Sequence, residues 1–270
     1  MTDGNSRHAG DFLERGLFKY GLVVISGLVI ITLWEVLTST TEIPSFIFPE
    51  PGAVWNRFLT VLLDGSLVFH TAVTLAEVVL GLLLGVGSAI LLGYLLAKST
   101  LVERVLAPYI VASQSIPIVA IAPLLVIWLG PGILSKVLTS ALIVFFPVLV
   151  NTIVGIRSVP EELYDLMKIL QANRWQKLTL LEVPASLPVF LGGLRIGATL
   201  AVIGAVVGEF VGADMGLGFL VNVGRGTYDT SLVFVAIFVL IAMALTLYGT
   251  VVMLENRLLS WKKKGIELNS

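Results

Sequence analysis

Cysteine is absent from the sequence, histidine occurs only twice, as His8 and His70, and charged residues make up only 13% of the chain. Without cysteine the chain has no disulfide bonds, no thiolate metal sites and no thiol catalysis. The sequence also lacks the H-E-x-x-H pattern of zinc hydrolases and the G-x-x-x-x-G-K-[ST] loop that binds nucleotide phosphates. We therefore expect no catalytic residue, no metal and no cofactor, and an ATP-driven activity would need a separate chain.

Apolar residues dominate what is present. They make up 57% of the chain, whereas soluble domains carry about 25% charged residues. Runs long enough to cross the roughly 30 Å hydrocarbon core, about 20 residues as helix, occur six times, at Tyr20–Leu37, Thr71–Ala97, Val105–Leu129, Ile133–Ile156, Leu187–Val211 and Leu232–Leu254. The sequence thus predicts an all-α, polytopic membrane protein with six transmembrane helices, built as one domain over residues 1–270.

The distribution of Lys and Arg predicts the orientation, because positively charged loops stay in the cytoplasm. With the N-terminus inside, 13 of the 17 Lys and Arg residues fall in cytoplasmic segments, among them Arg7, Arg15 and Lys19 near the start and Lys262, Lys263 and Lys264 near the end. The opposite side receives Arg57, Lys136 and Arg225. We expect both termini in the cytoplasm.

The fifth apolar run carries small residues at four-residue spacing, which places each set on one face of a helix and lets another backbone approach closely. The two predicted ridges are Gly193, Gly197, Ala201 and Ala205, and Gly204, Gly208, Gly212 and Gly216. We expect this helix to lie in the protein interior. Another helix is predicted before the second run, where Val54, Phe58, Val61 and Leu62 recur at helical spacing beside Trp55.

Between the fourth and fifth runs, Pro160–Pro188 is the longest amphipathic stretch. Ser158 and Glu161 fit a capping box that starts a helix, and Asn173 with Gln176 fits a second cap. An apolar stripe on the first helix consists of Leu163, Leu166, Met167 and Leu170. Two short cytoplasmic helices should meet at Ala172 and Asn173, either as a plain connector on the inner leaflet or as a docking element for a soluble partner.

Three carboxylates fall in apolar runs. Glu35 and Glu77 lie near run ends, which favours side chains that reach the membrane interface. Glu209 continues the small-residue face of the fifth run and should face protein, either to satisfy a partner or to touch a solute pathway. Paired acids and basic residues at mid-membrane, as expected for an ion-coupled carrier, are not evident.

Candidate pathway residues lie in the third run. Ser113, Gln114 and Ser115 cluster with Pro117 and Pro123, and prolines free backbone carbonyls there. Asn151, near the inner end of the fourth run, adds a polar group. These side chains either line a translocation pathway together with Glu209 or join helices through hydrogen bonds.

The order of polar stretch, proline and glycine-rich span resembles the permease subunits of ATP-binding cassette importers, the binding-protein-dependent transport family. Their cytoplasmic loop carries E-A-A, three residues, G, about nine residues and I-x-L-P. Aligned on Arg174, Trp175 and Gln176, the E-A-A positions fall on Asp165, Leu166 and Met167, the glycine on Gln171 and the proline on Pro184. Asp thus replaces Glu, and Gln replaces the glycine that the turn normally uses.

The resemblance implies a coupling helix that docks on ATPase subunits. It assigns this role to Asp165, Leu166, Met167, Lys168, Gln171, Ala172 and Asn173. It also implies a homodimer of permeases in the inner membrane, ATP-binding cassette ATPase subunits and an extracytoplasmic solute-binding protein as partners. No nucleic-acid partner is expected, and the chain itself is not an enzyme.

The segments LEVPASLP and GLRIGATLAVIGAVVGEFVGADMGLG are most similar to members that serve riboflavin or the pyrimidine precursor of thiamine. The uncharged polar cluster also suits a neutral heterocycle, since an anion site would gain from a cation. Nitrate, sulfonate or taurine remain alternative solutes within the same branch. A self-contained secondary carrier and a non-transporting scaffold are the alternatives from other classes.

Overall fold

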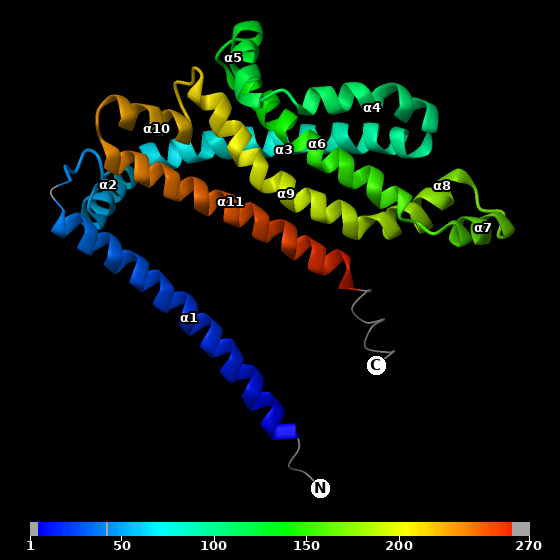
Figure 1. Ribbon diagram of the computed structural model, residues 1–270, viewed down its shortest axis with the longest axis horizontal. Helices are drawn as coiled ribbons and strands as arrows, with labels where there is room; N and C mark the ends of the chain where they lie inside the picture. The colour runs from blue at the N-terminus through cyan, green and yellow to red at the C-terminus, as the bar shows by residue number, and fades with distance from the viewer. Residues whose placement is uncertain (1–4, 42, 261–270) are drawn as a thin grey trace.

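The computed structural model describes residues 5–41 and 43–260, with side chains from residue 21 onward except residues 23 and 24. Helices account for nearly all of this part of the chain (Figure 1). They are α1 (Asn5–Thr40), α2 (Pro51–Leu63), α3 (Ser66–Lys98), α4 (Thr100–Gln114), α5 (Ile118–Leu129), α6 (Ile133–Arg157), α7 (Glu161–Ile169), α8 (Arg174–Lys177), the π-helical turn η1 (Leu178–Glu182), α9 (Val183–Phe210), α10 (Leu217–Gly226) and α11 (Thr230–Leu258).

Helix α6 is the centre of the bundle and packs extensively against α3 and α9. Helix α11 packs on α9, and α4 folds back along α3 (Figure 1). The short helices α2 and α10 lie at one end of the bundle, and α7 and α8 lie at the other. By the predicted orientation the first end is extracytoplasmic and the second is cytoplasmic, and they are called the outer and inner ends below.

Close packing around α6 depends on glycine. A Cβ atom on Gly85 would lie 2.7 Å from the backbone oxygen of Ala141, and one on Gly204 would lie 2.5 Å from Cα of Ser140. The first predicted ridge, from Gly193 to Ala205, is buried as expected. The second ridge was predicted too long, because α9 ends at Phe210 and Gly212 and Gly216 lie in the turn that follows.

Four helices are long and apolar enough to span a membrane, within the described residues. They are α3, α6, α11 and the continuous stretch Arg174–Phe210 that includes α9. The predicted span Val105–Leu129 is instead two helices, α4 and α5, bent by 94°. Pro117 explains the break, because it lacks an N–H and disfavours helical geometry in the residue before it. Counting this pair as one span gives five.

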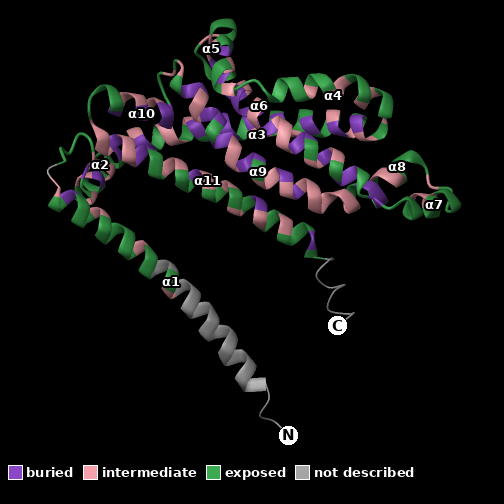
Figure 2. Cartoon of the chain, in the orientation of Figure 1, coloured by how far each residue is buried: buried purple, intermediate pink, exposed green. Residues whose placement is uncertain are grey.

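The first predicted span lies within α1. Its described apolar part, Ile25–Thr40, is shorter than a full span. Large apolar side chains along it are exposed, and α1 departs from the bundle (Figure 2). Such a surface suits lipid or another subunit. The side chains of Arg7, Arg15 and Lys19, and residues 262–264, on which the predicted orientation partly depends, lie outside the described residues.

Helix α2 forms as predicted and covers the outer end. Val54 and Val61 are buried, whereas Trp55 is exposed. Arg57 of α2 bonds to Asp229 at 2.7 Å, and Asp229 also caps α11. This ion pair ties α2 to the start of the last helix.

Candidate functional site

The amphipathic stretch predicted to be cytoplasmic forms two short helices, α7 and α8, as predicted, but its first cap differs. Helix α7 begins at Glu161 after Pro160, and no side chain caps it. Ser158 instead ends α6 and donates a hydrogen bond to the Gly155 carbonyl at 2.8 Å. The proposed Ser158 capping box is therefore wrong, because Pro160 already sets the extended entry and Ser158 belongs to the preceding helix.

The turn after α7 has a defined geometry. Gln171 has a φ of 54°, the left-handed region in which glycine is usual. Its N–H bonds to the Lys168 carbonyl, and the Ala172 N–H bonds to the Met167 carbonyl, each at 2.9 Å. These two bonds make a Schellman motif, which satisfies carbonyls at a helix end. Gln171 thus adopts the conformation that the corresponding glycine of the loop pattern would take.

The second cap was predicted correctly. Asn173 accepts a hydrogen bond from the Gln176 N–H, and the Gln176 side chain accepts one from the Asn173 N–H, both at 2.8 Å. This reciprocal pair is a capping box that fixes the start of α8.

The surface of this helix pair is apolar and uncovered in the chain. Leu166, Ile169, Leu170 and Trp175 are all exposed, with Ile169 at 78%. Asp165 and Lys168 form an exposed ion pair at 2.8 Å, and the hydrogen bond from Lys168 to this carboxylate raises the pKa of Lys168. An ordered turn that presents exposed apolar side chains is suited to bind another protein. We call residues 161–177 the coupling element.

Lys98, the last residue of α3, holds this element to the bundle. Its ammonium donates to Glu182 of η1 at 2.5 Å and to the Tyr164 hydroxyl of α7 at 3.2 Å. It also lies 4.9 Å from the centre of the Tyr164 ring. Nearby, Arg157 of α6 makes a two-pronged ion pair with Glu103 of α4, at 2.7 and 2.6 Å. Ion pairs and one hydroxyl contact thereby join α3 to α7 and η1, and α6 to α4.

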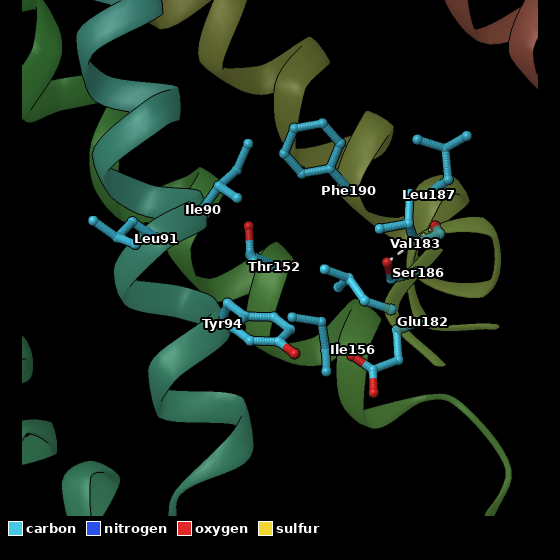
Figure 3. Close-up of a pocket in the computed structure, with 11 residues that line it drawn as sticks. Ile90, Leu91, Tyr94, Thr152, Ile156, Glu182, Val183, Ser186, Leu187 and Phe190 are labelled. Atoms are coloured by element: carbon cyan, nitrogen blue, oxygen red, sulfur yellow. Dashed lines mark hydrogen bonds between the residues drawn. The ribbon is translucent and has the colours of Figure 1, made fainter. Parts of the chain in front are cut away.

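An apolar cavity of about 400 Å³ lies beside η1 (Figure 3). It lies between α3, α6 and the start of α9, and its wall includes Tyr94, Thr152, Ile156, Glu182 and Phe190. In η1 the Val183 N–H bonds to the Leu178 carbonyl, five residues back. Pro184, which has no N–H, follows directly. Single π-helical turns of this kind are frequent at functional sites.

A second group of polar residues is buried at the outer end. Glu209 is 0% exposed, and its carboxylate accepts hydrogen bonds from the Thr74 hydroxyl at 2.6 Å and from the Gly218 N–H. The Leu217 N–H donates to Thr74, and the Gly216 N–H donates to His70 Nδ1 at 2.9 Å. Side chains from α3 and α9 therefore accept hydrogen bonds from the N–H groups of Gly216, which precedes α10, and of the first two residues of α10.

Glu77 and Lys136 complete this buried cluster, and Glu77 corrects a prediction. Glu77 is 1% exposed and does not reach the membrane interface. It lies close to Glu209 and to Lys136, which was assigned to the outer side of the membrane and lies near the start of α6 at 2% exposure. Glu77 and Glu209, two carboxylates within predicted spans, were the sequence signal that a cation should be buried beside them, since buried charges need partners.

The five predicted pathway residues do not form one cluster. Ser113, Gln114 and Ser115 are exposed at the bend between α4 and α5. Asn151 lies between α6 and α9, where its Cβ approaches Gly193. In the described part of the chain, no hydrogen bond joins these residues to one another or to Glu209, and their pathway role stays a prediction.

Comparison with known proteins agrees with these features. Residues 85–260 match the family described as binding-protein-dependent transport system inner membrane component. The riboflavin transport system permease protein RibX of Chloroflexus aurantiacus is 46% identical over 235 residues, covering 87% of this chain and 88% of that protein. The formylaminopyrimidine transport permease protein ThiX of Halalkalibacterium halodurans is 40% identical, with 88% and 94% covered. The taurine permease TauC of Escherichia coli is 32% identical, with 86% of each covered.

A solved structure shares the fold. The inward-facing MetNI methionine ABC transporter contains a chain that superposes with a TM-score of 0.63 at 16% identity, covering 73% of this chain and 97% of that one. The family match spans more than half of the chain, and the relatives above are similar over most of their length. The chain therefore belongs to the binding-protein-dependent transport system inner membrane components and is a multi-pass permease of the inner membrane.

Proposed function

We propose that two copies of this chain form the membrane pathway of an ATP-binding cassette importer. ATPase subunits bind the coupling element from the cytoplasm, and an extracytoplasmic binding protein delivers the solute. The observation that carries the proposal is the geometry of residues 161–177. Two short helices are joined by a Schellman turn and a capping box, with exposed apolar side chains and an anchor on α3. A rigid element attached to several spans can bias their arrangement according to the nucleotide state of a partner.

The solute that we propose is a heterocyclic vitamin or precursor, riboflavin or the thiamine pyrimidine. The relatives that transport riboflavin and formylaminopyrimidine are 46% and 40% identical to this chain, compared with 32% for the taurine permease. Four of the five side chains proposed for the pathway, Ser113, Gln114, Ser115 and Asn151, are uncharged, and the fifth, Glu209, is acidic. Such a set suits a neutral ring with hydrogen-bonding edges better than a sulfonate, because an anion site would gain from a cation.

Gentle extraction of a tagged chain from its native membrane tests the assembly. We expect an ATPase subunit and a binding protein to be recovered with it. Repeated recovery of the chain alone, with solute uptake that follows an ion gradient and needs no ATP, would instead support a secondary carrier. In that case Glu77, Lys136 and Glu209 would be the first residues to test as its coupling site.

Uptake by the recovered complex tests the solute. Labelled riboflavin, formylaminopyrimidine and taurine are offered separately to proteoliposomes that contain the complex, its binding protein and internal ATP. We expect ATP-dependent accumulation of one of the two heterocycles and little taurine. Accumulation of taurine alone would reject the proposed solute class while leaving the importer assignment in place.

A further inference from the structure

Lys98 occupies an unusual position for a basic residue at a helix end. It is the last residue of α3, and its side chain contacts two other elements, the coupling element through Tyr164 and the π-helical turn through Glu182. Tyr94 of α3 and Glu182 both line the cavity beside this turn. One ammonium group thus links α3, α7 and the entry to α9.

The ion pair is asymmetric in exposure, which makes it more than a surface contact. The Glu182 side chain is 6% exposed, whereas that of Lys98 is 35% exposed. A buried carboxylate depends on its cation, because an unpaired charge away from water is strongly unfavourable. Movement of Glu182 away from Lys98 is therefore opposed, and η1 and the end of α3 should move together.

The surroundings of Glu182 allow η1 to move together with the end of α3. The π-helical turn is closed by a hydrogen bond that spans five residues instead of four, and Pro184 has no N–H to bond back into this turn. The apolar cavity of about 400 Å³ beside this turn gives the side chains of Leu178 and Val183 room to repack (Figure 3). We call the contacts of Lys98 with Tyr164 and Glu182 the inner joint. It combines an ion pair with a helical turn that has space for a second arrangement.

Other ion pairs at the inner end lack this combination. Asp165 and Lys168 lie three residues apart within α7, and both are mostly exposed. Arg157 and Glu103 join α6 to α4, and Arg157 also donates to the Leu96 carbonyl of α3, but within residues 43–260 neither side chain bonds to the coupling element. Arg157 and Glu103 therefore provide a matched control.

We propose that Lys98 is a positioning residue for transport. It transmits displacement of the coupling element to α3 and, through Glu182, to α9, so that both spans respond to one ATPase movement. This inference rests on the proposed importer function and adds the residues by which the coupling element acts on the spans.

The test uses the complete complex of permease, ATPase subunits and binding protein in proteoliposomes, with riboflavin as the first probe and formylaminopyrimidine and taurine as the others. The quantity measured is the ATP hydrolysed per solute molecule accumulated. We expect Lys98→Met to raise this ratio about tenfold, within the usual range of allosteric coupling, while the ATPase subunits remain bound. Arg157→Met should leave the ratio within about twofold of the wild type.

Rescue separates transmission from simple support of the fold. The exchange of charges in Lys98→Glu with Glu182→Lys, and the conservative Lys98→Arg, should each bring the ratio back toward the wild-type value. A wild-type ratio in Lys98→Met, an equal rise in Arg157→Met, or an exchange variant that stays as uncoupled as Lys98→Met would overturn the proposal.

Two further outcomes are distinguished. If Lys98→Met does not insert, Tyr164→Phe removes only the hydroxyl contact and should still raise the ratio by about threefold; an unchanged ratio in that variant would reject the inference. If the wild-type complex accumulates none of the three probes with ATP, the proposed function fails on the wild type itself, before any variant is compared.

Discussion

At the scale of single residues, Gln171 shows a side chain in a backbone conformation that glycine prefers. Its φ of 54° lies in the left-handed region, which costs an L-residue about 1–2 kcal/mol. We expect Gln171→Gly to stabilise the turn by about 0.5–1 kcal/mol, after allowing for the greater freedom of glycine in the unfolded chain. Hydrogen exchange at the Ala172 amide should slow by about threefold to fivefold.

The neighbouring Leu170 provides the control for this prediction. It has an ordinary φ of −74°, so Leu170→Gly gains no relief of strain and should speed exchange at the same amide. Slower exchange in both variants, or faster exchange in Gln171→Gly, would contradict the interpretation of the turn.

Gly216 is a second residue whose identity is fixed by its surroundings. It has a φ of 109°, and a Cβ atom there would lie 2.1 Å from Oε1 of Glu209. We expect Gly216→Ala to destabilise the outer end by about 2 kcal/mol or more. Gly226→Ala, at the far end of α10 and with no atom within 4 Å of its Cβ position, should change stability by less than about 0.5 kcal/mol. Thermal unfolding of the purified chains compares the two, and equal midpoints would contradict the packing.

Burial of individual carboxylates was only partly predictable from the sequence. Glu209 was expected to face protein because it continues a ridge of small residues, and it is buried. Glu77 was expected at the interface because of its distance from the end of a run, yet it is also buried. The burial of both carboxylates depends on polar partners that the fold brings to them. Thr74 bonds to Glu209, and Lys136 lies close to Glu77.

At the scale of elements, a hydrogen bond from the start of α10 to a side chain of α3 holds α10 in place. Thr74 donates to Glu209 and accepts from the Leu217 N–H. Thr74→Val removes both bonds and leaves buried polar groups unsatisfied, which should cost about 2–3 kcal/mol. Thr71→Val, one turn earlier, removes only a bond to the Leu67 carbonyl of its own helix and should cost less than about 1 kcal/mol. Hydrogen exchange in α10 should rise strongly in the first variant only; matching rises would contradict the docking role of Thr74.

The coupling element offers a prediction about transport. Ala172→Pro removes the N–H that bonds to the Met167 carbonyl, so the Schellman turn opens while the spans still insert. We expect ATP hydrolysis to continue with solute uptake reduced about tenfold or more. Glu161→Pro is the control, because proline is tolerated in the first turn of a helix. Coupled uptake in Ala172→Pro at the level of Glu161→Pro would reject the coupling role of this turn.

Elements with strong local signals were predicted well. The apolar runs gave α3, α6, α9 and α11, and the Asn173–Gln176 box gave the start of α8. The bend between α4 and α5 was missed, although Pro117 lies at the break. Membrane helices tolerate proline when neighbours satisfy the freed groups, so whether a proline bends or breaks a span depends on packing that the sequence does not state.

For the whole molecule, the two buried polar groups lie at opposite ends of the same bundle. The outer cluster around Glu209 joins α3, α6, α9 and α10, and the inner joint at Lys98 joins α3, α7 and η1. Between them α3, α6 and α9 pack through glycine and alanine. Close backbone packing resists independent sliding of these helices. A displacement at the inner joint should therefore reach the outer end as a movement of the three helices together.

The predicted arrangement of these ends across the membrane can be measured, because the absence of cysteine makes every introduced thiol unique in the chain. Leu63→Cys and Tyr228→Cys, 84% and 74% exposed at the outer end, should react with an impermeant maleimide in intact spheroplasts. Ile169→Cys and Leu101→Cys, 78% and 72% exposed at the inner end, should react only after lysis.

The topology of α1 is tested separately. A tag before residue 1 should resist external protease if α1 also crosses the membrane, which would bring the number of spans to six. Cleavage of that tag in intact spheroplasts, with the four thiols behaving as expected, would leave the bundle orientation in place and reject α1 as a crossing helix with a cytoplasmic N-terminus.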